Sequence, residues 1–540
     1  MDMRLFSQRL MAERFQVGIW ALIFASIVAV RNILEAASSR PLIGVVVVDA
    51  TTFVHYTLFY LVLILLLTWI VAASIGELPH RLLIAALFLL PIIWIAPLTD
   101  LLLSGGIGFR MAYIFEPLAQ LFRSFLTYFG PLTVPGITPG IRFEIILLIG
   151  ILFWYVRSFT GNFWRSAASI VFSYTAIFVL MAMPAILSAI VGQAGSTYET
   201  VFDFWRSSLG NWNIGRNLVG SIQNEVYIRD VLFNVAMSQI YYVSASSLII
   251  LYWWHAQKKQ CIAWLQNSRP ERVIHYFMLA GLGFVLGVKN NLLYGGISWL
   301  EFISLMVLGI SIYCAWMWAV GMNDVADIEV DKISNNNRPL ISGVINKEIM
   351  STVSWVCFGW ALLGGWLLGL GAMSGVVIFL VGYLLHSVKP FRFKKISLLA
   401  NTLIAVSCLG AAYAGFFTSS ESQSIAKFPL SVAALILAAF SLSVHVKDIK
   451  DISGDAAAKI PTLLTTYGER LGKRIIGVLL AISFCMPALL LNQLQLWFTG
   501  AVSGIIGYTL VQRKLYNERY IFILYFIYAA ASLLLVGDIR

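Results

Sequence analysis

Two stretches of the sequence carry aspartates at the same spacing. In each, three aspartates stand at positions i, i+3 and i+7, and an asparagine directly precedes the first set. The two sets are Asn323 with Asp324, Asp327 and Asp331, and then Asp448, Asp451 and Asp455. Because residues at these intervals share one side of an α-helix, each set predicts a single acidic helix face.

Such acidic faces require positive charge nearby. Two carboxylates about 5 Å apart repel by roughly 3 kcal/mol at an effective dielectric of about 20. Placing one aspartate in a membrane-spanning helix against lipid costs about 3 kcal/mol of insertion free energy. Hard oxygen ligands suit Mg²⁺, which leaves positions open for phosphate oxygens. The sequence therefore predicts a polar cavity in which Mg²⁺ is held by Asn323, Asp324, Asp327, Asp331, Asp448, Asp451 and Asp455.

Basic residues follow both acidic sets and a span between them. The residues expected to bind a diphosphate are Arg338, Lys389, Arg392, Lys394 and Lys459. In a diphosphate site the metal bridges phosphate oxygens, while the cations neutralise charge on the leaving group. Taken singly, each of these residues is equally typical of the basic loops on the cytoplasmic side of any membrane protein.

Catalysis is expected to depend most on Asp324, Asp327, Asp448 and Asp451. Alanine at Asp324 or Asp448 should abolish turnover while the chain still folds and inserts into the membrane. The alternative is that both sets are solvated caps at helix ends. That alternative does not explain why the same triple spacing occurs twice, each time at the expected cytoplasmic end of an apolar run.

The composition excludes an ordinary water-soluble protein. Of 540 residues, 59% are hydrophobic and only 12% are charged, against about 25% charged residues in average soluble chains. The mean hydropathy is +0.84. The formal net charge is +11, which in a membrane protein reports orientation and does not indicate nucleic-acid binding.

Apolar runs of about 20 residues are long enough to cross a bilayer as helices, and we expect about fifteen of them. Six lie near 15–36, 53–74, 81–103, 143–156, 165–192 and 231–254. Nine lie near 274–288, 299–322, 350–367, 370–387, 397–417, 428–446, 474–492, 495–512 and 519–536. A polar stretch at 255–272 separates the two groups. We therefore expect an all-α polytopic membrane protein with a six-helix domain at 1–255 and a nine-helix domain at 256–540.

The distribution of Lys and Arg predicts the orientation of these spans. In the second half, twenty lie in loops on one side and three on the other. Because basic loops stay in the cytoplasm, both aspartate sets and the N-terminus are expected inside and the C-terminus outside, in a bacterial-type inner membrane. The first half carries no repeated chemical pattern, and its function stays open.

The aspartate sets resemble the signatures of the UbiA superfamily of intramembrane prenyltransferases. The first set is similar to NDxxDxxxD, and Asn337, Arg338 and Pro339 resemble its usual continuation. The second is similar to DxxDxxxD, followed by Lys459 and a threonine. The resemblance covers about 265–540. It implies a helical bundle with a lateral opening to the bilayer, two Mg²⁺ ions held by the two motifs, and a polyprenyl diphosphate between them.

The resemblance also implies a reaction of isoprenoid biosynthesis. Release of diphosphate would leave an allylic cation, which aromatic walls stabilise and an acceptor captures. The acceptor classes are an aromatic quinone precursor, a chlorin or a glycerol-phosphate lipid. Two alternatives remain: a terpene cyclase of the same fold, in which the prenyl chain captures its own cation, and a cation-coupled transporter, since repeated intramembrane acids also mark transporters.

One residue departs from the family pattern. Many members carry a YSxxPxRxK stretch, whereas this chain has His386 in place of the tyrosine, followed by Ser387, Lys389, Arg392 and Lys394. That departure puts in doubt any step assigned to the phenol. A single histidine at a helix end is more typical of a packed or hydrogen-bonded polar group than of a base.

Overall fold

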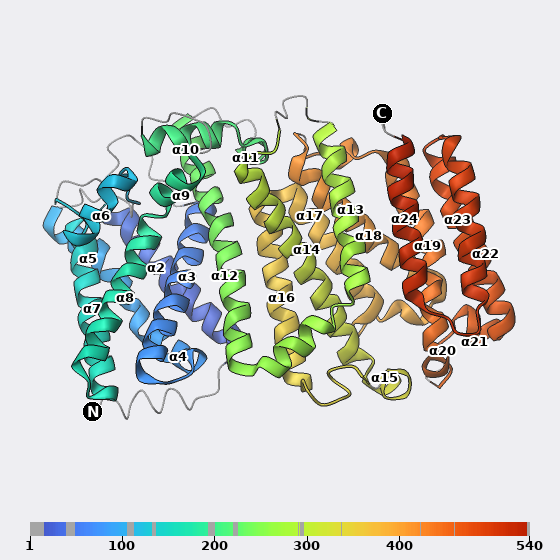
Figure 1. Cartoon of the computed structure of the whole chain (residues 1–540), viewed down its shortest axis with the longest axis horizontal. Coiled ribbons are helices and arrows are strands. Elements are labelled where there is room, and N and C mark those ends of the chain that lie inside the picture. The colour runs from blue at the N-terminus through green and yellow to red at the C-terminus, as the bar shows by residue number, and fades with distance from the viewer. Residues whose placement is uncertain are drawn as a thin grey trace. The chain divides into compact units, whose positions relative to one another are not determined.

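The computed structural model of the chain consists of helices (Figure 1). It describes residues 16–38, 49–104, 113–131, 137–192, 200–219, 225–289, 291, 296–335, 337–421, 423–457 and 460–536. Within these ranges there is no strand, and thirteen helices are long and apolar enough to cross a membrane by length and composition. The expected all-α, multi-pass membrane architecture is thereby confirmed.

Thirteen of the fifteen expected spans meet that description. They include all six runs of the first half and seven of the nine in the second. The last two runs form α23 (Gln495–Gln512) and α24 (Glu518–Val536), helices of 18 and 19 residues that fall outside the thirteen. Large apolar side chains such as Phe172 and Leu430 are exposed on the helices, as a surface in contact with lipid requires.

The chain divides into two compact units. The first comprises Met1–Lys258 and Gly295–Ile303, and the second comprises Lys259–Tyr294 and Ser304–Arg540. The division at Lys258 falls inside α12 (Glu225–Gln266), next to Gln257, whose backbone angles are not helical.

The first unit holds the helices of the N-terminal half. They are α2 (Val17–Ser38), α3 (Ala50–Ile75), α4 (Pro79–Leu89), η1 (Leu90–Trp94), α5 (Ile95–Ser104), α6 (Leu118–Leu126), α7 (Pro139–Thr160), α8 (Phe163–Met181), α9 (Met183–Val191), α10 (Val201–Gly210), α11 (Asn213–Val219) and most of α12 (Glu225–Gln266). Inside it, Arg31 forms a buried ion pair with Glu35 at 2.9 Å, and its guanidinium stacks near the rings of Tyr56 and Tyr60.

The second unit is a bundle built around one buried helix. Its elements are α13 (Pro270–Lys289), most of α14 (Trp299–Ala326), α15 (Ile328–Ser334), α16 (Lys347–Leu367), α17 (Leu370–Ser387), η3 (Phe393–Lys395), α18 (Ser397–Ser419), η4 (Ile425–Lys427), α19 (Leu430–Ser443), η5 (Val444–Lys447), α20 (Asp448–Ala457), α21 (Leu463–Tyr467), α22 (Glu469–Leu490), α23 and α24. The central helix α18 contacts α13, α17 and α19.

Glycines allow the helices around α18 to approach closely. A Cβ at Gly283 of α13 would collide with the carbonyl oxygen of Ala412 in α18, and one at Gly375 of α17 would collide with the backbone of Ala414. Small residues of this kind let membrane helices pack backbone to backbone. The close packing fixes α13 and α17 against α18.

The two aspartate sets lie on short elements that touch. The first set begins in α14, whose last residue is Ala326, and continues after Asp327 into α15. The second set lies entirely on α20, and α15 contacts α20 near the lower edge of Figure 1. The expectation of one continuous helix face is correct for the second set and wrong for the first, because the helix is interrupted at Asp327.

The glycine packing leads to a stability prediction. Gly283→Ala should lower the free energy of unfolding by about 1–3 kcal/mol, since α13 must move away from α18 to admit the methyl group. Gly281→Ala, two residues away on the same helix, is the matched control because a Cβ there meets no atom within 4 Å. Thermal unfolding of the purified proteins in one detergent measures the difference. Equal midpoints for the two variants would contradict the packing described here.

Candidate active site

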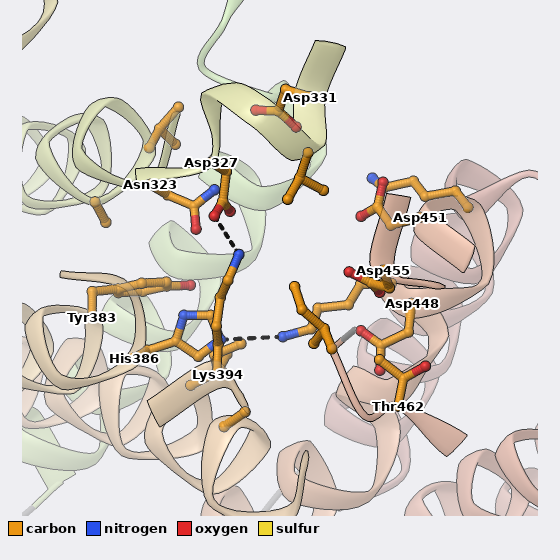
Figure 2. A pocket seen from close by; sticks show the side chains of 18 of the residues that line it. Asn323, Asp327, Asp331, Tyr383, His386, Lys394, Asp448, Asp451, Asp455 and Thr462 are labelled. Atoms are coloured by element: carbon orange, nitrogen blue, oxygen red, sulfur yellow. Dashed lines mark hydrogen bonds and ion pairs between the residues drawn. The ribbon is translucent and has the colours of Figure 1, made fainter. Parts of the chain in front are cut away.

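Both aspartate sets face one polar pocket of the second unit. The cavity has a volume of about 130 Å³, and Figure 2 shows the acidic side chains around it. Six of the predicted metal ligands line it: Asn323, Asp327, Asp331, Asp448, Asp451 and Asp455. Residues far apart in the sequence therefore meet at one cavity.

In the first set, aspartates pair with basic side chains. Asp327 accepts a hydrogen bond from Arg392 at 2.8 Å and a second, very short one from Lys394. Asp331 forms an ion pair with Arg338. Burial raises the pKa of Asp331 to about 6, and the positive charge of Arg338 acts in the opposite direction. These cations offset the repulsion between the carboxylates.

Asp324 lies behind the pocket and does not line it. Its carboxylate is 1% exposed and accepts hydrogen bonds from Asn267 at 2.7 Å, Arg338 at 2.7 Å and Arg269 at 3.2 Å. In this arrangement Asp324 holds Arg338, which does line the pocket. Its predicted role as a metal ligand stays a prediction, and its described contacts are those of a residue that positions an arginine.

The aspartates of the second set are more exposed than those of the first, and the side-chain amide of Asn335 links the two sets. Asn335 donates from Nδ2 to Asp331 at 3.1 Å and to Asp451 at 3.3 Å, so its side chain links both sets. Asp448 lies 3.9 Å from the imidazole of His445, whose Nδ1 contacts the amide of Asn401 at 2.8 Å.

The residues predicted to bind diphosphate occupy different places. Arg338 and Lys394 line the pocket. Arg392 contacts Asp327 without lining the cavity, and Lys389 is exposed outside the lining. Lys459 lies outside the described residues. The structure thus brings two of the five predicted cations to the cavity and a third to its edge.

Four further cations of the lining were not singled out from the sequence. They are Arg269, Arg272, Lys447 and Lys450. The sequence held a signal for each of them. Arg269 and Arg272 lie just before the span at 274–288, whereas Lys447 immediately precedes Asp448 and Lys450 lies within the second aspartate set. Sequence reasoning attributed all four to the basic bias of cytoplasmic loops.

The donor atoms fit Mg²⁺ in their chemistry, although they are not gathered around one point. Nowhere in the described ranges do three or more His, Cys, Asp or Glu side chains stand close enough together to hold a metal ion. Lys394 contacts Asp327, and Arg338 contacts Asp331, so cationic groups already neutralise the carboxylates that a metal would bind. Because both side chains are long and flexible, they can turn away without a change in the backbone.

An apolar cavity adjoins the polar pocket. It has a volume of about 300 Å³ and is lined by apolar and aromatic side chains of α13, α19, α22 and α24. The two cavities share four lining residues, which are Arg272, Tyr383, Ile404 and Lys447. A ligand with a polar head in one and an apolar tail in the other would therefore pass these four side chains.

Aromatic side chains stand where the two cavities meet. The hydroxyl groups of Tyr276 and Tyr383 share a short hydrogen bond, and Trp316 lies 5.7 Å from the Tyr383 ring, centroid to centroid. Aromatic faces can stabilise a cation held close to them. Of the aromatic residues of this half, Trp316 and Tyr383 line the polar pocket, whereas Trp318 packs against Trp355.

His386 is buried at the rim of the polar pocket. Its Nδ1 contacts Ser387 Oγ at 2.7 Å, and Ser387 donates to Asn323 Oδ1 at 3.0 Å. Its Nε2 contacts Lys447 Nζ at 3.4 Å, and the dashed line that starts at His386 in Figure 2 marks this contact. The expectation of a hydrogen-bonded polar group is confirmed in these contacts, since both ring nitrogens have partners.

Comparisons with known proteins agree on the second half of the chain. The sequence model of the UbiA prenyltransferase family matches residues 277–528. The digeranylgeranylglyceryl phosphate synthase of Sulfolobus acidocaldarius is 31% identical over 224 residues, which cover 40% of this chain and 75% of that protein. The bacteriochlorophyll synthase 34 kDa chain of Chloroflexus aurantiacus is 25% identical over 280 residues, which cover 49% of this chain and 84% of that protein.

A similarity to a solved structure was also found. A UbiA homologue from Archaeoglobus fulgidus, bound to GPP and Mg²⁺, aligns with a TM-score of 0.40 at 14% sequence identity. The alignment covers 51% of this chain and all of that one.

The burial of Asp324 leads to a prediction that separates stability from activity. Asp324→Ala should lower the free energy of unfolding by about 3–5 kcal/mol, because it removes the carboxylate that pairs with Arg269 and one of the two carboxylates that pair with Arg338. Asp451→Ala removes one hydrogen bond and should cost only about 0.5–1.5 kcal/mol. Thermal unfolding in detergent, with size-exclusion profiles, measures both. A midpoint for Asp324→Ala as high as that of Asp451→Ala would rule out the buried network.

Proposed function

This chain belongs to the UbiA prenyltransferase family, and we propose that its residues 256–540 transfer a prenyl group from a polyprenyl diphosphate to a small or lipid acceptor in a Mg²⁺-dependent reaction. That the chain is a prenyltransferase follows from the family and from relatives with prenyltransferase names. What we propose beyond the family is the metal, the prenyl donor and the acceptor. The boundary at 255 is also proposed, and the division of the chain at Lys258 supports it.

One observation carries the proposal. A pocket lined by both aspartate sets shares four lining residues with an apolar cavity. A prenyl diphosphate has the matching shape, with a strongly anionic head and an apolar tail. Its head suits the cations and metal-binding oxygens of the polar pocket, and its tail suits the adjoining cavity. The bond between the two parts would then lie beside Arg272, Tyr383 and Lys447.

The chemistry follows from that placement. The bond between the first prenyl carbon and the diphosphate oxygen breaks, and its electron pair leaves with the diphosphate. An allylic cation remains beside Tyr383 and Trp316, whose rings stabilise positive charge and exclude water. A nucleophilic atom of the acceptor supplies the electron pair of the new bond, and the proton that it loses passes to solvent.

Basic side chains would stabilise the leaving group. Arg338 and Lys394 now pair with Asp331 and Asp327, and both reach the polar pocket. Asn323 and the aspartates of the lining would hold Mg²⁺, which would supply positive charge to offset that of the diphosphate. Arginine and lysine released from the carboxylates can then donate to the diphosphate. The number of ions, proposed as two, rests on the two separate aspartate sets.

The acceptor is proposed only as a class. Relatives bear the names digeranylgeranylglyceryl phosphate synthase, bacteriochlorophyll synthase and homogentisate phytyltransferase. We therefore propose a glycerol-phosphate lipid, a chlorin or an aromatic quinone precursor, and an activity assay has to offer all three.

The decisive experiment is a product analysis with purified protein. The full chain is incubated with Mg²⁺, labelled prenyl diphosphates and an acceptor of each class, and the products are analysed by mass spectrometry. We expect a prenylated acceptor, no product with EDTA, and a rate lowered by about 100- to 1,000-fold in Asp327→Asn and Asp448→Asn. Glu329→Gln should retain activity, because Glu329 is 84% exposed and pairs only with Lys332 among the described residues.

Each other outcome has a clear meaning. A cyclised hydrocarbon formed without any acceptor would replace the transferase with a terpene cyclase. Turnover that survives EDTA would contradict the metal requirement. Full activity in both aspartate variants would show that the chemistry takes place elsewhere in the chain.

We also propose the orientation of the site. The basic loops around the aspartate sets support a cytoplasmic site in a bacterial-type inner membrane, with the N-terminus inside and the C-terminus outside. Lys347, at the start of α16, and Lys427, in η4, are both exposed and belong to loops expected on opposite sides.

Thiol labelling tests this orientation. In a cysteine-free background, Lys347→Cys should react with a membrane-impermeant maleimide only in inside-out vesicles. Lys427→Cys should react only in right-side-out vesicles, and it serves as the matched control. The reverse pattern would invert the topology, and labelling of both from one side would contradict the span count between them.

A further inference from the structure

Lys447 differs from the other cations of the polar pocket. Five of the six cations in its lining form ion pairs: Arg269 with Asp324, Arg272 with Glu518, Arg338 with Asp324 and Asp331, Lys394 with Asp327, and Lys450 with Glu518. Lys447 forms none with any residue that the structure describes, although it is only partly exposed. Among the described residues, its positive charge is therefore the one in this lining that no carboxylate contact neutralises.

A neutral imidazole holds the Lys447 ammonium in place. Lys447 Nζ has only protons to donate, so His386 Nε2, 3.4 Å away, must be the acceptor. The ring proton then resides on Nδ1, which donates to Ser387 Oγ at 2.7 Å, and Ser387 donates to Asn323 Oδ1 at 3.0 Å. One chain of hydrogen bonds thus runs from the residue before Asp448 to the asparagine of the first set.

The position of Lys447 matches the bond that has to break. Lys447 and Arg272 are the two cations among the four residues shared by the polar and the apolar cavity. Arg272 is engaged by Glu518 at 2.8 Å. In a donor that spans the two cavities, the oxygen linking tail and diphosphate lies at this junction. The negative charge of the leaving group develops on that oxygen.

We infer that Lys447 contacts the leaving diphosphate as a catalytic residue and that His386 is its positioning residue. The inference rests on the proposed function and adds to it the group that faces the bridging oxygen. When the carbon–oxygen bond breaks, the electron pair goes to that oxygen, and the Lys447 ammonium stabilises it by hydrogen bonding while keeping its own proton. His386 orients the ammonium and takes no part in proton transfer.

The chemistry of imidazole accounts for histidine at this position. A carboxylate would hold Lys447 more tightly but would cancel the charge that the leaving group needs. The phenol of a tyrosine, the usual residue in the family stretch, would have to accept from Lys447 and donate to Ser387 through one and the same oxygen. Neutral imidazole accepts through Nε2 and donates through Nδ1 at the same time, and it leaves the charge of Lys447 intact.

The test measures diphosphate binding and turnover separately. The purified full chain is titrated with magnesium pyrophosphate by calorimetry, and prenyl transfer is followed by mass spectrometry. Lys447→Met should weaken pyrophosphate binding by about 10- to 100-fold, since a hydrogen bond from a charged group is lost, and should lower kcat. Lys447→Arg should recover part of both. Lys473→Met is the matched control, because Lys473 pairs with Glu469 outside the pocket.

Variants of His386 separate its two contacts. Gln at 386 can present an acceptor near the position of Nε2, Asn can present a donor near that of Nδ1, and Leu offers neither. We expect His386→Gln to retain more turnover than His386→Asn, and His386→Leu to retain least. The part of the His386→Leu loss that passes through Lys447 should be absent in a Lys447→Met background, so the two losses together should be smaller than their sum. A merely structural role would instead add its loss to that of Lys447→Met.

The outcomes distinguish this inference from the function on which it rests. If wild-type protein transfers prenyl groups and Lys447→Met binds pyrophosphate and turns over normally, the inference is wrong and the proposed function stands. If Lys447→Met is impaired but His386→Leu is not, the positioning role is wrong. If wild-type protein neither binds pyrophosphate nor transfers a prenyl group, both fall. Should Lys447→Met fail to fold, pyrophosphate binding and turnover of Lys447→Arg and of the three His386 variants are compared with those of the wild type instead. Normal values in all of them would contradict the inference.

Discussion

Carboxylates buried inside a membrane protein need polar surroundings or positive partners, and the organisation of the second unit follows from that constraint. An ionised aspartate against lipid is costly, and several together also repel one another. The chain meets both costs by turning its two aspartate sets toward one pocket and by placing arginine and lysine among them. Asp324, Asp327 and Asp331 each contact at least one basic side chain.

The same pairing prepares the pocket for an anionic ligand. A set of carboxylates without cations would repel a diphosphate, and a set of cations without carboxylates would repel Mg²⁺. Because the two signs alternate, Lys394 and Arg338 neutralise the aspartates until a ligand binds. A bound metal would then become the partner of the aspartates, and a phosphate the partner of Lys394 and Arg338. Lys447 stands apart, because its contact is a neutral imidazole. The pocket thus combines charges that can exchange partners with one charge that is already available.

Rigid packing behind the pocket holds these groups in place. Close contacts between α18 and its neighbours α13 and α17 depend on glycines such as Gly283 and Gly375. The helices cannot slide without loss of that packing, so the residues at their ends keep their separations. Polar contacts continue the support outward, from Asn267 and Arg269 to Asp324 and from Asp324 to Arg338.

The sequence by itself determined the membrane class, the existence and approximate bounds of the long helices, and the spacing of the acidic residues in the two aspartate sets. These depend on local composition and on spacing along one chain, such as the i, i+3, i+7 pattern of Asp448, Asp451 and Asp455. Only the tertiary structure decided which residues share a cavity. It set Asp324 behind the pocket, interrupted the helix at Asp327, and brought Arg272 and Lys447 to the junction of two cavities. Side-chain partners such as His386 and Lys447 are far apart in the sequence, and only the packing of α17 and η5 in the folded bundle brings them into contact.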